Sequence, residues 1–430
     1  MILRDPVHGL VAFESDEANI VPMLLGAREV QRLRRIRQLG LTSLAFPGAE
    51  HTRFAHAVGA AHVMQLLVAR LRQIDGELPF WQRMTSERAR DAIAAALLHD
   101  IGHGPFSHLF EDAIPDSVKH ETWTARILLS PDSDVHQILV REDAGLPARV
   151  AELVEGRHAL AYLESAVSGI FDVDRCDYLL RDAHATGVTY GDYDLPWLLR
   201  SLRLDSRREG SSDRAPGLAI DGMKGITAIE SFLLARLFMF QQVYFHKSTR
   251  AAESMIRGIL RRAVHLVQNG TKLPVHLPAL DAVAAGEQPS LASYLELDDQ
   301  TLLVAMHAWE SSSDAILSDL SRRLRARELH KTIELSGVES DRPNDEALAI
   351  AREVATAHGL DPDHYVSLDE ASDTPYPQSA NLPVIFPDGR ARELGEVSFL
   401  LGRLKGQTLT RTRLVFAREL RADIQKALAR

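Results

Sequence analysis

Cysteine is almost absent from this sequence of 430 residues. Cys176 is the only one, so the chain forms no internal disulfide bond and offers no cluster of thiolates to a metal ion. A single cysteine is typical of proteins from reducing compartments, and we expect a cytoplasmic protein.

Long apolar runs and a net positive charge are also missing. No uninterrupted apolar run approaches about 18 residues, the length of a membrane-spanning helix. The opening stretch MILRDPVHG carries charge where a secretory signal would be apolar. The formal net charge of −10 argues against a protein that coats nucleic acid. We therefore expect a globular protein with neither a membrane nor a nucleic acid as its partner.

Apolar residues recur at helical spacing along most of the chain. The clearest helical patterns cover residues 27–40, 54–71, 86–100 and 225–267, the last as one long helix or two. A polar hairpin or loop is expected at 203–220 and a proline- and serine-rich linker at 369–383, followed by short strands in VIF, EVSFLL and RLVFA and a terminal helix. The expected fold class is mainly α, with a helical core over residues 1–368 and a small mixed α/β portion over 369–430.

Histidine, in contrast, is abundant and concentrated. Seven of the 18 histidines lie between His51 and His120, and three fall within HDIGHGPFSH at 99–108. His99 and Asp100 follow an apolar helical run, where packing alone gives no reason for an imidazole beside a carboxylate. This part of the sequence is therefore a candidate for a chemical site.

Two further segments carry compatible chemistry. HTRFAH, at 51–56, places Arg53 and His56 about one helical turn apart. DVDRCDYLLRD, at 172–182, puts Asp174, Tyr178 and Asp182 on one helix face. Imidazoles with carboxylates form a donor set suited to iron, manganese, magnesium or zinc. A bound ion of this kind activates water at neutral pH, so the three segments together favour hydrolysis of a phosphate ester.

The order of the motifs resembles that of HD-domain deoxynucleoside triphosphate triphosphohydrolases. The matching segments, all within residues 1–260, are DPVHG, QRLRRIRQLG, FPGAEHTRFAH, HDIGHGPFSH, KHE, DVDRCDYLLRD and VYFHK. This family includes bacterial dNTPases and the HD core of the vertebrate SAM-and-HD-domain dNTPase. The resemblance implies an HD-domain helical core that hydrolyses dNTPs to deoxynucleoside and inorganic triphosphate, by attack of water on the α-phosphorus.

The resemblance also implies a role for individual residues. The implied metal ligands are His56, His99, Asp100 and Asp174. The implied catalytic residues near the α-phosphate are His103, His108, Glu111, His120 and Asp172, with His108 as proton donor. The implied substrate-binding residues are Arg53, Arg175 and Arg236 at the triphosphate, Gln38, Leu39 and Asp182 at the deoxyribose, Tyr178 against a 2′-hydroxyl, Tyr244 near the base, and Lys247 either here or in a regulatory pocket. Glu111 and Arg175 stand where the family usually has Asp and Lys.

Cofactor, regulation and assembly follow from the same resemblance. It implies one divalent ion per active site (Mn, Fe, Mg or Zn) and is compatible with a second Mg²⁺ bound together with the nucleotide. It also implies a homo-oligomer, either a dimer or a tetramer. In members activated by a regulatory nucleotide, an Asp reads guanine five residues before the Gln of QRLR. Gly26 stands at that position here, although Gln31 and Arg34 remain. We therefore expect weak activation by GTP, or none.

Two alternatives to dNTP hydrolysis stay open. One is an HD phosphatase or phosphodiesterase acting on another nucleotide, and the number of basic residues argues against it. The other is a nucleotide sensor without turnover, and the intact set of ligands and histidines argues against that.

Overall fold

The computed structural model describes residues 1–113, 118–205, 216–335, 343–379 and 382–429. Helix accounts for 58% of the structure and strand for 11%, which confirms the expected mainly α class. The helices of the first half are α1 (Val21–Gly26), α2 (Arg28–Arg32), α3 (Arg53–Ile74), α4 (Ser86–Leu98), α5 (His108–Ala113), α6 (His120–Leu129), α7 (Asp134–Glu142), α8 (Leu146–Val154), α9 (Ala161–Ser168), α10 (Val173–Thr186), α11 (Leu195–Arg200) and α12 (Ile226–Met239).

A second group of helices and most strands follow. The helices are α13 (Lys247–Gln268), α14 (Pro278–Ala284), α15 (Leu291–Leu295), α16 (Asp299–Trp309), α17 (Ala315–Arg325), α18 (Asn344–Ala357), α19 (Pro362–Tyr365), α20 (Leu394–Val397), α21 (Phe399–Leu404) and α22 (Arg421–Leu428). The strands are β1 (Ile2–Asp5), β2 (Gly9–Ala12), β3 (Leu202–Asp205), β4 (Gly217–Asp221), β5 (Lys331–Glu334), β6 (Val366–Asp373), β7 (Pro383–Ile385), β8 (Ala391–Glu393) and β9 (Leu409–Phe416).

Helices α3, α4 and α10 pack together and form the centre of the helical core. Thr85 caps α4 by accepting a hydrogen bond from the Arg88 amide, and Gly187 ends α10 in the left-handed conformation at φ 75°. Where α3 crosses α10, a Cβ at Gly59 would lie only 1.8 Å from Oδ1 of Asp177. Only glycine allows this approach, which brings the two helices close enough to share polar contacts.

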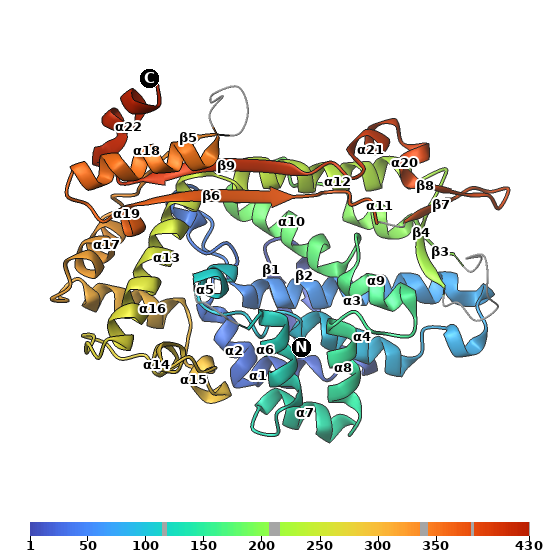
Figure 1. The fold of residues 1–430 in the computed structure, drawn as a ribbon. Coiled ribbons are helices and arrows are strands. Elements are labelled where there is room, and N and C mark those ends of the chain that lie inside the picture. The colour runs from blue at the N-terminus through green and yellow to red at the C-terminus, as the bar shows by residue number, and fades with distance from the viewer. Residues whose placement is uncertain (114–117, 206–215, 336–342, 380–381, 430) are drawn as a thin grey trace.

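A second apolar cluster holds α13–α17 against the C-terminal strands and against Phe106, Leu109 and Phe110. Figure 1 shows the β6–β9 ribbon along one edge of the molecule, with α18 against it. Strand β9 pairs antiparallel with both β5 and β6. The C-terminal strands therefore pack on the helical core.

The remaining C-terminal strands complete a sheet begun much earlier in the chain. Strands β3 and β4 form the expected hairpin at its described ends, and β7 adds to β4 in parallel, giving the order β3-β4-β7-β8. The expected strands at VIF and RLVFA correspond to β7 and β9, each with one further residue beyond the strand. The strand expected at EVSFLL is wrong, because Leu394–Val397 and Phe399–Leu404 are helical. The stretch 225–267 is two helices joined by a π-helical turn at Phe240–Tyr244. The proposed domain boundary after residue 368 stays a prediction, and it lies within β6.

Two segments are long and apolar enough to cross a membrane by length and composition, Arg53–Glu77 and Ile226–Tyr244. Neither segment is an uninterrupted apolar run, since His62 and Arg70 lie within the first and Glu230 within the second. Leu67 and Phe232, one from each segment, are fully buried. Since core helices pass the same test, two such segments are weak evidence for a membrane span.

Candidate metal and phosphate site

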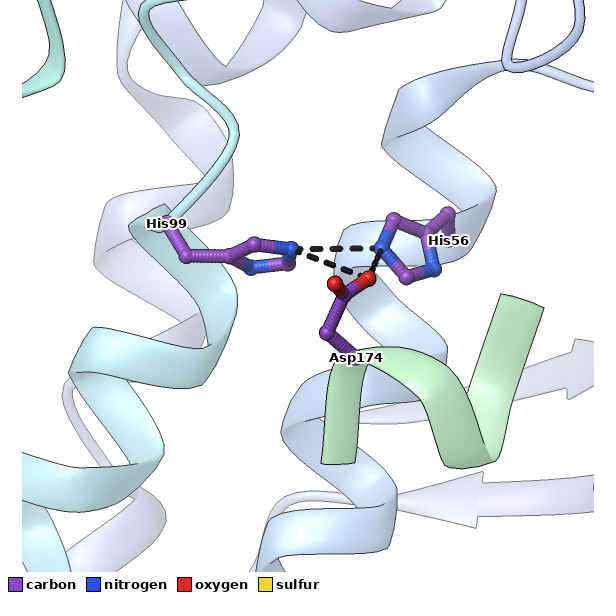
Figure 2. A group of neighbouring side chains, drawn as sticks. All are labelled: His56, His99 and Asp174. Carbon is purple, nitrogen blue, oxygen red and sulfur yellow. Dashed lines mark hydrogen bonds and ion pairs between the residues drawn. The ribbon is translucent and has the colours of Figure 1, made fainter. Parts of the chain in front are cut away.

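Three of the predicted metal ligands meet at one point. Figure 2 shows His56 from α3, His99 at the end of α4 and Asp174 from α10 converging. His56 Nε2 lies 3.0 Å from Asp174 Oδ1 and 3.3 Å from His99 Nε2. The fourth predicted ligand, Asp100, adds its Oδ1 3.4 Å from His99 Nε2 and its Oδ2 3.7 Å from His56 Nε2. The structure thus brings the four together.

The histidine rings are oriented by their other nitrogens. His56 Nδ1 hydrogen-bonds Asp177 at 2.8 Å, and His99 Nδ1 hydrogen-bonds the Ala96 carbonyl at 2.9 Å. Because each Nδ1 donates a proton to an oxygen, each Nε2 keeps its lone pair for a cation. Two imidazole nitrogens with two carboxylates fit a divalent ion of the iron, manganese or zinc type.

Without an ion, the cluster holds protons. Burial alone would lower the pKa of His56, but hydrogen bonds to Asp174 and Asp177 raise it to about 10. Burial likewise opposes ionisation of Asp174, yet the hydrogen bonds from His56 and His99 hold its pKa far below its usual range. The carboxylates of Asp174 and Asp177 therefore favour a positive charge at this point of the structure.

Asp177 is the hub of a buried network behind the ligands. Its carboxylate accepts hydrogen bonds from His8 Nε2 at 2.6 Å, from His56, and from Arg181 Nε and Nη2 at 2.8 Å each. Arg181 also donates to Asp5 at 2.9 Å. The N-terminal DPVHG segment therefore supports the predicted metal ligand His56 through Asp177, beyond the turn that Asp5 forms with the amides of Val7 and His8.

A second imidazole cluster lies next to the first. The rings of His103 and His120 stack with centroids 3.7 Å apart, and Glu111 Oε1 lies 3.1 Å from His120 Nδ1 and 4.0 Å from His103 Nδ1. His103 Nε2 lies 3.2 Å from Asp100 Oδ1, which connects the clusters. Burial and the Arg53 charge lower the pKa of His103 well below its usual range, so its ring is neutral at pH 7. His108 begins α5, but its side chain is outside the described part of the structure.

The loop carrying these histidines has strained backbone. Phe106 and Ser107 have φ of 53° and 62°, values that cost about 1–3 kcal/mol for each non-glycine residue. The Phe106 backbone amide donates a hydrogen bond to Asp299 at 2.7 Å. Arg53 donates two hydrogen bonds to the Ser107 hydroxyl, at 2.7 and 3.0 Å. Arg32 donates to the His103 carbonyl at 2.8 Å. It is buried, although the charges of a segment such as RLRRIR are usually solvated. These contacts hold the loop in its strained form.

Each of the three predicted phosphate-binding arginines is paired with a carboxylate. Arg53 pairs with Asp100, Arg175 with Asp172, and Arg236 with Asp373 at 2.7 Å. Arg175 and Arg236 line the same cavity of about 390 Å³, together with residues of the C-terminal segment such as Leu382. Burial raises the pKa of Asp172 to about 6 against the opposing effect of Arg175. The arginines are thus fixed in position before any phosphate binds.

The predicted sugar-side residues form a third group. Asp182 accepts hydrogen bonds from the Tyr244 hydroxyl at 2.8 Å and from His51 Nε2 at 2.7 Å. Tyr178 lies between this group and the metal cluster, with its ring centroid 6.3 Å from that of Tyr244 and 6.5 Å from that of His56. The backbone N–H of Gln38 donates to the His51 carbonyl at 3.0 Å.

Three other predicted positions lie at the edge of this arrangement. Leu39 is half-buried against the main apolar core. Lys247 is exposed at the start of α13, where its charge acts on His246. Gln31 lies in α2, close to Gly26 at the end of α1, and accepts a 2.9 Å hydrogen bond from Arg34.

Sequence reasoning missed Asp177, Arg181, His51 and Asp373. Asp177 and Arg181 were within the quoted DVDRCDYLLRD segment, three and seven residues after Asp174 on the side facing α3, so helical spacing could have found them. His51 is the first residue of the HTRFAH segment. Asp373 had no local signal, because it comes from the end of β6.

The comparisons with known proteins agree with this geometry. A model of the HD domain matches residues 53–181, and a model of an HD-associated region matches residues 216–430. The chain is 36% identical over 98% of its length to YwfO of Bacillus subtilis, of which 93% is covered. It is 26% identical over 83% of its length to the deoxynucleoside triphosphate triphosphohydrolase SAMHD1 of Gallus gallus, and spans 60% of that protein.

A solved structure gives the same answer. A phosphohydrolase from Bacteroides thetaiotaomicron has a TM-score of 0.80 to this chain at 29% identity, covering 97% of this chain and 100% of that one. The fold, the grouped HD residues and the relatives agree with the resemblance carried by the motifs. The chain belongs to the HD-domain phosphohydrolases, the family that includes the deoxynucleoside triphosphate triphosphohydrolases.

Proposed function

We propose that this protein hydrolyses dNTPs to deoxynucleoside and inorganic triphosphate. The observation that carries the proposal is the row of side chains along α10. Asp174 lies in the metal cluster, Tyr178 follows one turn later, and Asp182 follows after another turn beside Tyr244. At 1.5 Å per residue the row spans about 12 Å, which suits an α-phosphate at one end and a deoxyribose at the other.

The donor set supports a divalent ion held by His56, His99, Asp100 and Asp174. When bound, such an ion supplies Lewis acidity, which lowers the pKa of a coordinated water and offsets phosphate charge. The support for it here is the orientation of the two Nε2 atoms, each fixed by the hydrogen bond of the opposite ring nitrogen.

The protein's own residues would do the remaining work. Arg175 and Arg236, which line the same cavity, would bind the phosphates beyond the α-position. Their pairing with Asp172 and Asp373 limits the reorganisation that binding requires. By resemblance, His108 would deliver the proton to the 5′-oxygen. Glu111 and His120, which lie beside the neutral His103, would be its partners.

The test is product analysis with each of the four dNTPs. The protein is incubated with Mn²⁺ and one dNTP in ¹⁸O-water, and the phosphorus products are identified by ³¹P NMR and mass spectrometry. We expect tripolyphosphate carrying the label, together with deoxynucleoside. Asp174→Ala, which removes a proposed ligand, is the control and should lose both bound metal and activity. Orthophosphate with dNDP would contradict the proposal and favour a general nucleotide phosphatase, and nucleotide binding without turnover would favour a sensor.

The same proposal covers assembly, regulation and location. A homo-oligomer is expected from the resemblance to the dNTPases, and light scattering of the purified protein tests it. A regulatory nucleotide other than GTP is compatible with the retained Gln31 and Arg34. A cytoplasmic location agrees with the one buried, unpaired cysteine.

A further inference from the structure

A separate cavity of about 470 Å³ opens beside His8, outside the site described above. Its walls come from the turn between β1 and β2, from α3, from α10, and from α11 with the residues before it. His8 is the side chain that donates to Asp177, so the inner end of this cavity is two hydrogen bonds from the ligand His56.

The cavity changes character along α3. His62, Leu66 and Arg70 line it at intervals of four residues, so they share one helix face, and His62 and Arg70 are about 12 Å apart along the axis. His62 contacts the His8 ring with centroids 5.4 Å apart, and its buried Nδ1 has no hydrogen-bond partner among the described residues. One end is therefore polar and lined by imidazole rings.

The opposite end is cationic. Arg70 donates to the Leu202 carbonyl at 2.9 Å, while its buried Nε has no partner within the described chain. Arg200, from the end of α11, is exposed at the same cavity. No Asp or Glu is among the described residues that line the cavity. Burial and the charges of Arg203 and Arg200 lower the pKa of Arg70, in agreement with positive charge that the cavity itself does not neutralise.

The wall between the two ends is apolar. Leu66, Leu180, Leu195 and Leu199 supply most of it, from three different helices. Leu66 is 41% exposed, although it sits on a helix whose other leucines are buried in the core. An exposed leucine beside two arginines favours a ligand with a charged head and an apolar body.

We propose that this cavity binds an apolar molecule carrying one anionic group, a carboxylate or a phosphate monoester. The anionic group lies between Arg70 and Arg200, and the apolar body follows Leu66, Leu180 and Leu199 toward His62. This binding needs neither a metal ion nor nucleotide turnover, so it stands apart from the proposed hydrolysis.

Isothermal titration calorimetry tests the site with three probes of equal chain length: decanoate, decyl phosphate and decanol. We expect saturable binding of at least one anion, and the preference between the two distinguishes a carboxylate ligand from a phosphate one. Decanol, which lacks the charge, should bind at least tenfold more weakly. Arg70→Gln combined with Arg200→Gln should weaken binding of the anion at least tenfold, and Arg261→Gln, an exposed arginine on α13, should leave it unchanged.

A second variant keeps the test decisive if loss of the Arg70 contact to Leu202 disturbs the fold. Leu66→Glu places a negative charge at a partly exposed position of the apolar wall, and should abolish binding of both anions without altering the circular dichroism spectrum. The proposal is overturned if neither anion binds at millimolar concentration, if decanol binds as tightly as the anions, or if folded Leu66→Glu protein binds like the wild type.

Discussion

Oδ2 of Asp177 lies 2.8 Å from Nδ1 of His56, on the opposite side of the imidazole from Asp174. This contact keeps a proton on Nδ1 of a predicted metal ligand and orients its ring. Carboxylates in this position typically change metal affinity by 10–100-fold when they are removed.

Asp177→Asn should therefore weaken Mn²⁺ binding by about 10–100-fold. The amide keeps the size of the side chain but removes the charge that stabilises the proton on Nδ1. The measurement is a metal titration by calorimetry. Asp5→Asn is the matched control, because Asp5 contacts Arg181 on its other side and should change stability more than metal affinity. Equal metal affinity in Asp177→Asn and wild-type protein would contradict this role.

Metal uptake should release a proton. With the pKa of His56 raised to about 10, chiefly by Asp174 and Asp177 against the effect of burial, the metal-free ring is protonated at pH 7 and the ion must displace that proton. Affinity should then rise with pH by up to about tenfold per unit between pH 7 and 9. Titrations in two buffers of different ionisation enthalpy count the protons released, and a pH-independent affinity over this range would rule the effect out.

A histidine far from the site should govern acid stability. His330 precedes β5 and is 5% exposed, and burial together with the Arg323 charge lowers its pKa to about 4. The neutral ring contributes its full stability above the unfolded pKa of about 6.5, and that stability is lost as pH falls from there toward 4. Between pH 6.5 and 5 the loss is about 2 kcal/mol, at about 1.4 kcal/mol per unit.

Urea unfolding at pH 7 and pH 5 measures this loss for the wild type and for His330→Gln. Glutamine is similar in size and does not titrate, so the variant should lose less stability than the wild type over this range, by about 2 kcal/mol. His358→Gln, at an exposed histidine of the same half of the chain, controls for general acid effects. Identical losses in wild type and His330→Gln would show that His330 does not carry the effect.

Selection for deoxyribose should depend on Tyr178. The phenol ring lies between the metal cluster and Asp182, so a 2′-hydroxyl packed against it would lose its water without gaining a partner. An unpaired buried polar group costs roughly 1–3 kcal/mol, which is about tenfold to a hundredfold in rate. Tyr178→Ala should therefore admit rNTPs while weakening dNTP turnover moderately.

The measurement compares dATP with ATP, and dGTP with GTP, on both proteins. Tyr244→Phe is the companion variant, because it removes the hydroxyl that donates to Asp182 while keeping the ring. It should weaken dNTP binding without admitting rNTPs. Wild-type protein that already hydrolyses ATP as fast as dATP would exclude Tyr178 as the determinant.

Regulation by guanine nucleotide should be weak. Gly26 ends α1 without a carboxylate to read guanine, and Arg34 lies over the Phe54 ring, 3.5 Å from its centroid. Rates of dNTP hydrolysis with and without GTP should differ by less than about twofold, a free-energy difference of about 0.4 kcal/mol. A saturable, GTP-specific rise well above this would show that another residue reads the base.

The sequence predicted the parts of the site that are local along the chain. His99 and Asp100 are neighbours, and Asp174, Tyr178 and Asp182 share a helix face, so periodicity and residue type were enough. His56 was a candidate from the HTRFAH segment, but its role as a ligand came from the family resemblance, because its meeting with Asp174 depends on how α3 packs on α10. Asp373 reaches Arg236 from the C-terminal strands, a long-range contact that no local pattern encodes.

The strand expected at EVSFLL failed for a related reason. Its alternation of apolar residues is compatible with a strand, yet Ser398 caps a helix by accepting a hydrogen bond from the Leu401 amide at 3.0 Å. That hydrogen bond stabilises the start of α21 and outweighs the β-propensity of Val397 and Phe399. Contacts of this kind determine whether a short apolar segment between turns forms a helix or a strand.

The absence of a side chain at Gly59 has a consequence for how the protein gains and loses a metal ion. Because α3 and α10 approach closely at Gly59 and are joined by the hydrogen bond between His56 and Asp177, the packing that positions the predicted ligands does not depend on a metal ion. Chelation should therefore empty the site and leave the protein folded, unlike small metal-nucleated domains that unfold when stripped. An ion held in this way would be exchangeable, and its identity would depend on which divalent metals are present when the site is loaded.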